Sequence, residues 1–462
     1  MPRAADDCRP RLREPLRSCA EIRATGDLAK KSRASAEREP SLCFDAMRSL
    51  SIALAVSLLA CTKPSSVAVD AAPASSASAV ASASPSAPAS VAAVAMPTDA
   101  ERLASASNAF GVDLWRRAAP AGKNFALSPA SVSAALAMTW GGARGETERQ
   151  MRSVLHLEGT QDAVSADWGR LSRALQSPSR KVELRIANRL FGEKTFSFEK
   201  PFLERTKSDW DAPFEPVDFV HGAGAARVHV NGWVASRTHD KIKDLLPEHA
   251  VDESTRLVLV DAIHFLASWS SPFEEKATSE AAFHVAPGPS KNVPTMHQTH
   301  GFRWVQRDDV TMLELPYKGD DASMWIVLPD RADGLADVEK SLTAAKLAAW
   351  RAALVWKEVE VTLPKFEVHP GTLGLAGPLA ELGMKDAFDA NRADFTGIGT
   401  PPDPKMRLYL GNAYHQTFVD VDEKGTEAAA ATAVVMAVGG GPPPTPIAFH
   451  ADHPFLLFVV DK

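Results

Sequence analysis

Residues 421–436 constrain the fold more than any other part of the chain, because they join a charged start to a run of small residues near the C-terminus. In an extended strand the side chains alternate between two faces. One face of this segment would be small and largely apolar, and the other would hold a single acidic side chain. The first face carries Thr426, Ala428, Ala430, Thr432, Val434, Met436 and Val438, and the second carries Glu427, Ala429, Ala431, Ala433, Val435 and Ala437. The pattern predicts a strand that slides between two others without a clash, with a helix or a linker as the alternative because alanine is the best helix former.

The pattern within this segment and several motifs elsewhere in the chain resemble those of one known family. From Glu423 the chain follows a pattern of Glu, a variable residue, Gly425, Thr426, Glu427 and alanines that ends at Thr432. This pattern resembles the hinge of the reactive-centre loop in the serpins. Other serpin-like motifs occur in the family's order, and their joint order makes the resemblance specific over roughly residues 99 to 462. They are residues 124–138, 142–147, 257–269, 272–273, 315–319, 324–329, 363–366, 382–383, 387–388, 393–395 and 453–458.

Helical and extended patterns are mixed along this region without regular alternation, which predicts an α+β class. We expect helices at residues 131–140 and 203–210, and strands at residues 182–190, 257–265, 324–328, 358–363 and 455–460. The resemblance implies the same class. It implies a serpin fold with a large central β-sheet that accepts an extra strand, further sheets, surrounding helices and an exposed reactive-centre loop.

Composition and motifs narrow the function classes. A chain of 462 residues with 45% hydrophobic residues can bury a large core, and its net charge of -6 favours neither nucleic acid nor an anionic membrane as partner. The chain has no His-Glu-x-x-His, paired-cysteine or Gly-x-Ser-x-Gly motif. The glycines at 439–441 lack the Gly-Lys-Ser/Thr of a phosphate loop. We therefore expect no enzymatic activity, no metal and no cofactor.

The N-terminal region divides into three parts. Residues 1–46 have no apolar periodicity and indicate a mis-assigned start or an unstructured leader, with Met47 as the alternative start. Residues 47–61 have the layout of a secretory signal and end in a sequence that resembles a bacterial lipoprotein signal, so that Cys61 would receive lipid. An ordinary signal peptide cut near Ala60, or a chance apolar run, are the alternatives. Residues 62–98, rich in Ala, Ser and Pro, predict a flexible tether in front of the domain at residues 99–462.

This layout predicts a secreted or membrane-anchored protein of the cell envelope or extracellular space, held by a membrane tether through lipidated Cys61. Cysteine usage agrees, since Cys8, Cys19, Cys43 and Cys61 all precede the domain. The domain therefore has no disulfide.

The resemblance implies a monomeric inhibitor that traps a target serine protease. The protease attacks the exposed loop and forms an acyl-enzyme, and the freed loop then inserts into the central sheet. The candidates for the attacked position are Val438, Gly439 and Gly440. No Lys or Arg lies between Gly425 and Val460, so elastase-like or subtilisin-like targets are favoured over trypsin-like ones, with papain-like cysteine proteases as a lesser alternative. The competing classes are a non-inhibitory serpin-fold binding protein and a tethered adhesin or scaffold.

The resemblance also implies a polar cluster that controls the opening of the sheet. It comprises Ser128, Ser131 and His415, with Trp269 near the hinge and Asp261 where the family usually has Asn. Ordinary core packing, with Ser128 as a helix cap, is the alternative. An Asp261 buried beside His415 would form a pH-sensitive pair, which a pH profile of the inhibition rate tests.

The C-terminal end departs from the family pattern. After residues 455–460 the family continues into one more core strand, whereas this chain ends at Lys462. We expect an uncovered hydrophobic edge there. A truncated reading frame, an unstable domain and completion of the sheet by another segment are the three alternatives.

Overall fold

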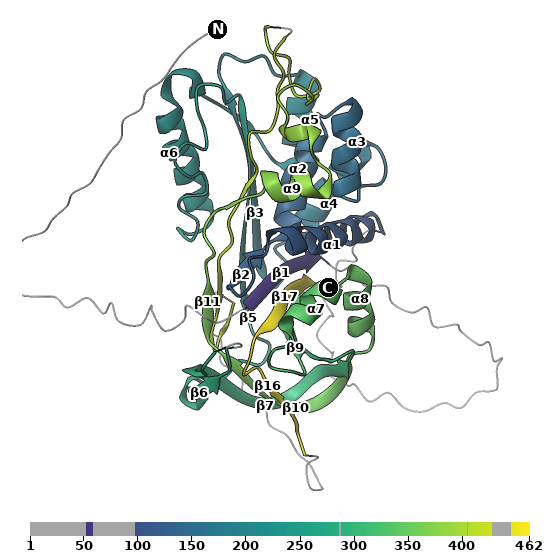
Figure 1. The fold of residues 1–462 in the computed structure, drawn as a ribbon, viewed down its shortest axis with the longest axis vertical. Helices are drawn as coiled ribbons and strands as arrows, with labels where there is room; N and C mark the ends of the chain where they lie inside the picture. Colours follow the sequence, from purple (N-terminus) through teal and green to yellow (C-terminus); the bar gives the residue numbers. More distant parts are fainter. Residues whose placement is uncertain (1–51, 59–97, 286–287, 404, 427–444) are drawn as a thin grey trace, which may run out of the picture. The chain divides into compact units, whose positions relative to one another are not determined.

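A computed structural model describes residues 52–58, 98–285, 288–403, 405–426 and 445–462 (Figure 1). The helices in this part of the chain are α1 (Thr98–Ala118), α2 (Pro129–Trp140), α3 (Gly145–Val154), α4 (Gln161–Leu175), α5 (Lys200–Trp210), α6 (Phe219–Arg237), α7 (Leu335–Ser341), α8 (Ala344–Ala352) and α9 (Ala376–Leu382). The strands are β1 (Ile52–Leu58), β2 (Phe125–Leu127), β3 (Glu183–Glu193), β4 (Phe214–Val217), β5 (Leu257–Ser268), β6 (Ser279–Phe283), β7 (Lys291–Arg307), β8 (Val310–Pro316), β9 (Ala322–Pro329), β10 (Val355–Pro364), β11 (Phe366–Val368), β12 (Leu373–Gly374), β13 (Tyr414–His415), β14 (Val419–Val421), β15 (Gly425–Thr426), β16 (Ile447–His450) and β17 (Phe455–Asp461). The helices predicted at residues 131–140 and 203–210 and the strands predicted at residues 182–190, 257–265, 324–328, 358–363 and 455–460 are all present, and the α+β class is confirmed.

Two large sheets organise the described residues. One has the strand order β16-β10-β7-β8-β9-β17-β1-β2, with β6 also paired to β7. The other has the order β11-β14-β15-β5-β3-β4. Strands β3 and β5 form its longest antiparallel pair, in which Glu183 lies opposite Leu266 and Gly192 opposite Leu257.

Helices cover both faces of the β3–β5 pair (Figure 1). On one face, Val258 and Val260 of β5 pack with apolar residues of α6. On the other face, Leu257 and Leu259 pack against the core cluster to which α2 and α4 contribute. Because successive side chains of a strand point to opposite faces, β5 serves both layers.

Helix α2 supplies the middle of the core. Ser128 caps it, since the Ser128 side chain accepts a hydrogen bond from the backbone N–H of Ser131, and Pro129 stands in the first turn where no backbone N–H is needed. Almost all of its residues are buried, because it lies between the sheet and the other helices.

Strand β17 has no open edge, in contrast to the expectation from the sequence. It pairs antiparallel with β9 on one side and parallel with β1 on the other, where Ile52 lies opposite Phe455. Strand β1 in turn pairs with β2. The segment beside β17 is therefore part of the region predicted as a signal sequence.

Among the described residues, no helix combines the length and the apolar character that crossing a membrane requires.

Candidate functional site

The hinge begins with a tight turn. The side-chain Oδ1 of Asp422 accepts hydrogen bonds from the backbone N–H of Lys424 at 2.8 Å and of Gly425 at 3.1 Å. This turn separates β14 from β15, so the continuous strand expected from Val421 onward is wrong at this point. The short β15 instead lies between β14 and β5 in the strand order, where it pairs with the last two residues of β5.

Gly425 allows β15 to approach β5. A Cβ atom at this position would lie 2.0 Å from the carbonyl oxygen of Ala267, which no side chain tolerates. Gly425 pairs with Ser268, and Thr426 pairs with Ala267. The glycine of the hinge pattern is therefore explained by the closeness of the neighbouring backbone.

Two aromatic side chains hold the hinge. The indole N–H of Trp269 donates to the carbonyl of Asp422 at 2.9 Å, and the Trp269 backbone N–H donates to the carbonyl of Lys424 at 2.9 Å. The indole stacks on Tyr317 with ring centroids 4.7 Å apart. The Tyr317 hydroxyl is hydrogen-bonded to Oγ1 of Thr426 at 2.6 Å, and burial raises the Tyr317 pKa, so this hydroxyl stays protonated. Thr426 is itself buried.

Glu423 ties the hinge to the neighbouring strands. Its carboxylate accepts a hydrogen bond from Oγ1 of Thr278 at 2.7 Å and lies 2.8 Å from Nζ of Lys365. Burial by itself raises the pKa of Glu423, but the bonds from Lys365 and Thr278 outweigh it and leave the pKa below its ordinary value. Glu423 is therefore ionised at neutral pH.

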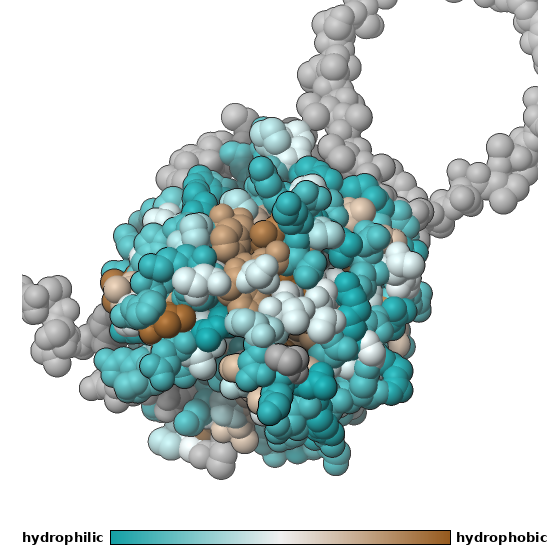
Figure 2. Space-filling view, turned by 90° about the horizontal axis from the view of Figure 1, so that it is seen from above, coloured by the Kyte–Doolittle hydropathy of each residue, from teal (hydrophilic) through white to brown (hydrophobic). Residues whose placement is uncertain are grey.

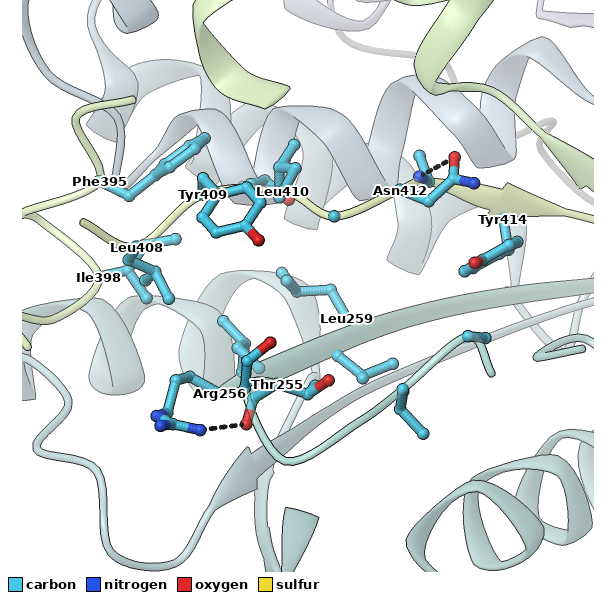
Figure 3. A pocket seen from close by; sticks show the side chains of 18 of the residues that line it. Thr255, Arg256, Leu259, Phe395, Ile398, Leu408, Tyr409, Leu410, Asn412 and Tyr414 are labelled. Atoms are coloured by element: carbon cyan, nitrogen blue, oxygen red, sulfur yellow. Dashed lines mark hydrogen bonds between the residues drawn. The ribbon is translucent and has the colours of Figure 1, made fainter. Parts of the chain in front are cut away.

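A slot lies along the first half of β5, the strand whose last residues pair with the hinge. A cavity of about 920 Å³ lies between the first half of β5 and the segment of residues 408–415. Leu259 of β5 lines one side, while Leu408 and Leu410 line the other (Figure 3), and Leu257 is also a lining residue. Helix α2 forms the floor with Val132 and Leu136 among its lining residues. Figure 2 looks onto this end of the molecule and shows apolar residues gathered among polar ones.

The predicted polar cluster lies at this slot. The backbone N–H of Ser128 donates to Nε2 of His415 at 3.0 Å, so this nitrogen carries no proton. Both residues are buried, and burial lowers the pKa of His415 to about 4. Ser131 and His415 both line the slot. The backbone of Asp261 pairs with Asn188 within the sheet, whereas its side chain, and with it the pair expected with His415, lies outside the described residues.

Comparison with known proteins identifies the family. A family model described as "Serpin (serine protease inhibitor)" matches residues 105–462. The chain belongs to the serpin family. It is 40% identical over 370 residues to "Leukocyte elastase inhibitor" of Sus scrofa, covering 78% of this chain and 95% of that protein. It is 38% identical over 357 residues to "Iris" of Ixodes ricinus, covering 76% of this chain and 93% of that protein. Among solved structures, "Cleaved Serpin 42Da" matches with a TM-score of 0.70 and 28% identity, covering 79% of this chain and 96% of that one.

Several predicted positions of this serpin lie outside the described residues. They are Cys61, the rest of the hinge (Glu427, Ala428, Ala429, Ala430, Ala431 and Thr432) and the candidates for the attacked position (Val438, Gly439 and Gly440). The structure brings Glu423, Gly425 and Thr426 together with Trp269, and it places Ser131 and His415 at the slot, with Ser128 hydrogen-bonded to His415.

Sequence reasoning missed three hinge contacts, Tyr317, Lys365 and Thr278. Tyr317 and Lys365 both fall within the serpin-like motifs, but those motifs carry no signal that a hydroxyl or an ammonium group meets the hinge. Thr278 stands outside every motif. Among the described residues, no group of three His, Cys, Asp or Glu side chains is arranged to hold a metal ion.

Proposed function

We propose that this serpin inhibits serine proteases as a suicide substrate. The catalytic serine of the protease attacks a backbone carbonyl at Val438 or Gly439. The peptide bond breaks, the amine leaves with a proton, and an ester joins the protease to the N-terminal side of the loop. That side then enters the slot as a new strand before water reaches the ester, so that the serpin takes part as a trapped reactant and not as a catalyst.

The register of β15 carries this proposal. Gly425 and Thr426 already pair antiparallel with Ser268 and Ala267. Ten steps along the loop from Thr426 is Met436, and ten steps back from Ala267 is Leu257, the first residue of β5. Continuing the existing ladder therefore uses the whole of β5, and Val438 falls just beyond its end. This register supports an attacked bond at Val438 or Gly439, just past the first residue of β5.

The same register explains why both faces of the loop are small. Paired residues in an antiparallel ladder point to the same face, so the even-numbered residues from Thr426 to Met436 would share the side of Leu257 and Leu259, above α2. The odd-numbered residues from Ala429 to Val435 would share the side of Val258 and Val260, below α6. Both layers are apolar along residues 257–260, so large or charged side chains would be excluded from the loop residues that pair there, residues 433–436, whereas Glu427 would pair with Leu266 outside that stretch.

The energy released by insertion is substantial. About ten new ladder hydrogen bonds at roughly 1 kcal/mol net each give on the order of 10 kcal/mol, before apolar burial is counted. This matches the ~5 to 15 kcal/mol total stability of an ordinary domain. The uncut form is therefore held kinetically.

The residues before the attacked bond favour elastase-like and subtilisin-like targets, because Ala437 and Val438 suit small apolar specificity pockets. Papain-like cysteine proteases are the lesser alternative. The name of the pig relative, an elastase inhibitor, supports the same class.

The deciding experiment mixes the protein with elastase or subtilisin and looks for a complex that survives boiling in detergent. Thr426→Arg should abolish this complex while cleavage near Val438 continues, because Thr426 is 4% exposed and an arginine there would bury a charge and displace the Tyr317 hydroxyl. Glu427→Arg is the matched control, since the register points this residue to the opposite face, and it should retain the complex. Undiminished trapping by Thr426→Arg would refute insertion, and cleavage of the unaltered protein without any complex would favour a non-inhibitory binding protein.

For localisation, we propose export and lipidation at Cys61. Removal of the signal would also remove β1, so the processed and unprocessed forms differ in the strand beside β17. Intact mass and lipid labelling of the cell-derived protein, compared with Cys61→Ser, test this. An unlipidated protein that retains residues 52–58 would refute it.

A further inference from the structure

One exposed surface stands apart from the slot. On β10, Val355 is 49% exposed and Trp356 is 62% exposed, which is unusual for side chains of this size. The neighbouring strand β7 places Arg303 directly opposite Trp356, and the Arg303 guanidinium lies 5.8 Å from the centre of the indole ring. Trp356 and Arg303 lie on the same face of the sheet and form what we call the Trp356 patch, whereas Val355 and Lys357 point to the other face.

The charge of Arg303 is only weakly compensated. Its nearest carboxylate in an ion pair is that of Glu314, 4.0 Å away, and the same Glu314 lies 2.8 Å from Nζ of Lys462. The patch thus combines a wide apolar ring with one cation, Arg303, and Glu358 follows two residues after Trp356 on the same face of β10. Trp and Arg are the residue types that most often dominate protein–protein interfaces.

The patch lies beside the return point of the loop. Strand β16 begins at Ile447, which pairs with Val359 of β10, and the two strands run parallel. The chain before Ile447 therefore arrives from the end of β10 that carries Trp356. These strands lie together at one end of the molecule (Figure 1).

A protease held by the loop can reach this patch. Gly439 is eight residues before Ile447, which limits the separation to about 28 Å. Trp356 is three residues from Val359, or about 10 Å along the strand. A protease domain of ~250 residues has a radius of gyration of about 18 Å. Its surface therefore spans the distance from the attacked bond to the patch.

We propose that the Trp356 patch is a second contact surface for the protease that attacks the loop. This inference rests on the proposed function. The protease would present an apolar side chain to the face of Trp356 and a carboxylate to Arg303. Because the contact lies outside the loop, it would govern how fast the protease is captured and leave the outcome of trapping unchanged.

The test measures the second-order rate of complex formation with elastase and with subtilisin, using the full chain. Trp356→Ala should slow capture about 5- to 30-fold, the effect of an interface residue worth one to two kcal/mol. Arg303→Glu should slow it similarly and reduce its dependence on salt. The number of inhibitor molecules consumed per protease should stay the same, since the hinge and loop are untouched.

Val228→Ala is the matched control, because Val228 on α6 is also 62% exposed and lies far from the loop's return to the sheet. Thermal unfolding verifies that the exposed substitutions leave the fold intact. If Trp356→Ala and Arg303→Glu capture both proteases at rates within twofold of the unaltered protein, the role of the patch as a contact surface is refuted. The proposed function would still stand in that case, because the complex forms. Failure of the unaltered protein to form any complex would instead refute the proposed function, and the patch with it.

Discussion

Replacing Glu423 with Gln tests what holds the hinge in its uncut position. Gln keeps the shape of the side chain and can still bond to Thr278, but it loses the charge that faces Lys365. A charged hydrogen bond contributes about 1.5–3 kcal/mol. Because the Lys365 side chain is 36% exposed while that of Glu423 is 7% exposed, solvent screening reduces this contribution to about 1–2 kcal/mol.

A loss of this size corresponds to a factor of 5 to 30 in the population of released hinge. Incubation at a moderately raised temperature should therefore inactivate Glu423→Gln about 5 to 30 times faster than the unaltered protein, as measured by titrating the remaining inhibitory capacity against elastase. Lys365→Met should be more harmful, because it leaves a buried carboxylate without its cation. The double variant should recover part of that loss. Equal half-lives for all four proteins would refute the assignment.

The same pair predicts a pH dependence. The pKa of Glu423 lies below its ordinary value of 4.5 in the folded protein, so the unfolded chain takes up the proton first as the pH falls. The stabilisation is complete above about pH 4.5 and is lost as the pH falls through the folded-state pKa. Glu423→Gln lacks this titration. The difference in unfolding free energy between the two proteins should therefore be present at pH 7 and shrink towards zero in acid.

Two further predictions concern the sheet. Burial lowers the pKa of His415 from 6.5 to about 4, so the unfolded chain is protonated first as the pH falls. This difference should contribute about 3 kcal/mol of stability that is present above pH 6.5 and is lost between pH 6.5 and 4. Urea unfolding of His415→Gln should show a flatter dependence of stability on pH, and parallel profiles for the two proteins would contradict this. Gly425→Ala should displace β15 and convert much of the inhibitor into a cleaved substrate, because the new Cβ would meet the carbonyl oxygen of Ala267. Gly377→Ala is the control and should preserve inhibition, because a Cβ at that position would have no neighbouring atom within 4 Å. Equal inhibition by both variants would remove the steric explanation.

The family could be predicted from the sequence because the signals that identify it are local. Alternation and residue size identify a segment able to enter a sheet, and the motifs that surround it predict the family. Strands such as β9 and β17 could also be predicted from the sequence, since their apolar runs are continuous.

Other features depend on contacts between distant segments. Tyr317 and Thr426 are 109 positions apart, and nothing in the local pattern of either residue indicates their hydrogen bond. The turn at Asp422 was missed because a charged residue beside Lys424 and Gly425 is equally compatible with an extended chain. Alternation in the sequence separates the two faces of the loop, whereas the packing of α6 on Val258 and Val260 of β5 required the layers of the fold.

If the loop inserts as proposed, the pairing of β15 with β5 also limits how the loop can change in length. Side chains repeat every two residues along a strand, so adding or removing one residue between Thr426 and the attacked bond would reverse the orientation of every later side chain. A change of two residues would keep the orientation and move only the position of the protease. Natural or engineered insertions and deletions in this stretch should therefore involve even numbers of residues. Whether the stretch has an odd or an even number of residues should vary less among related proteins than its sequence does.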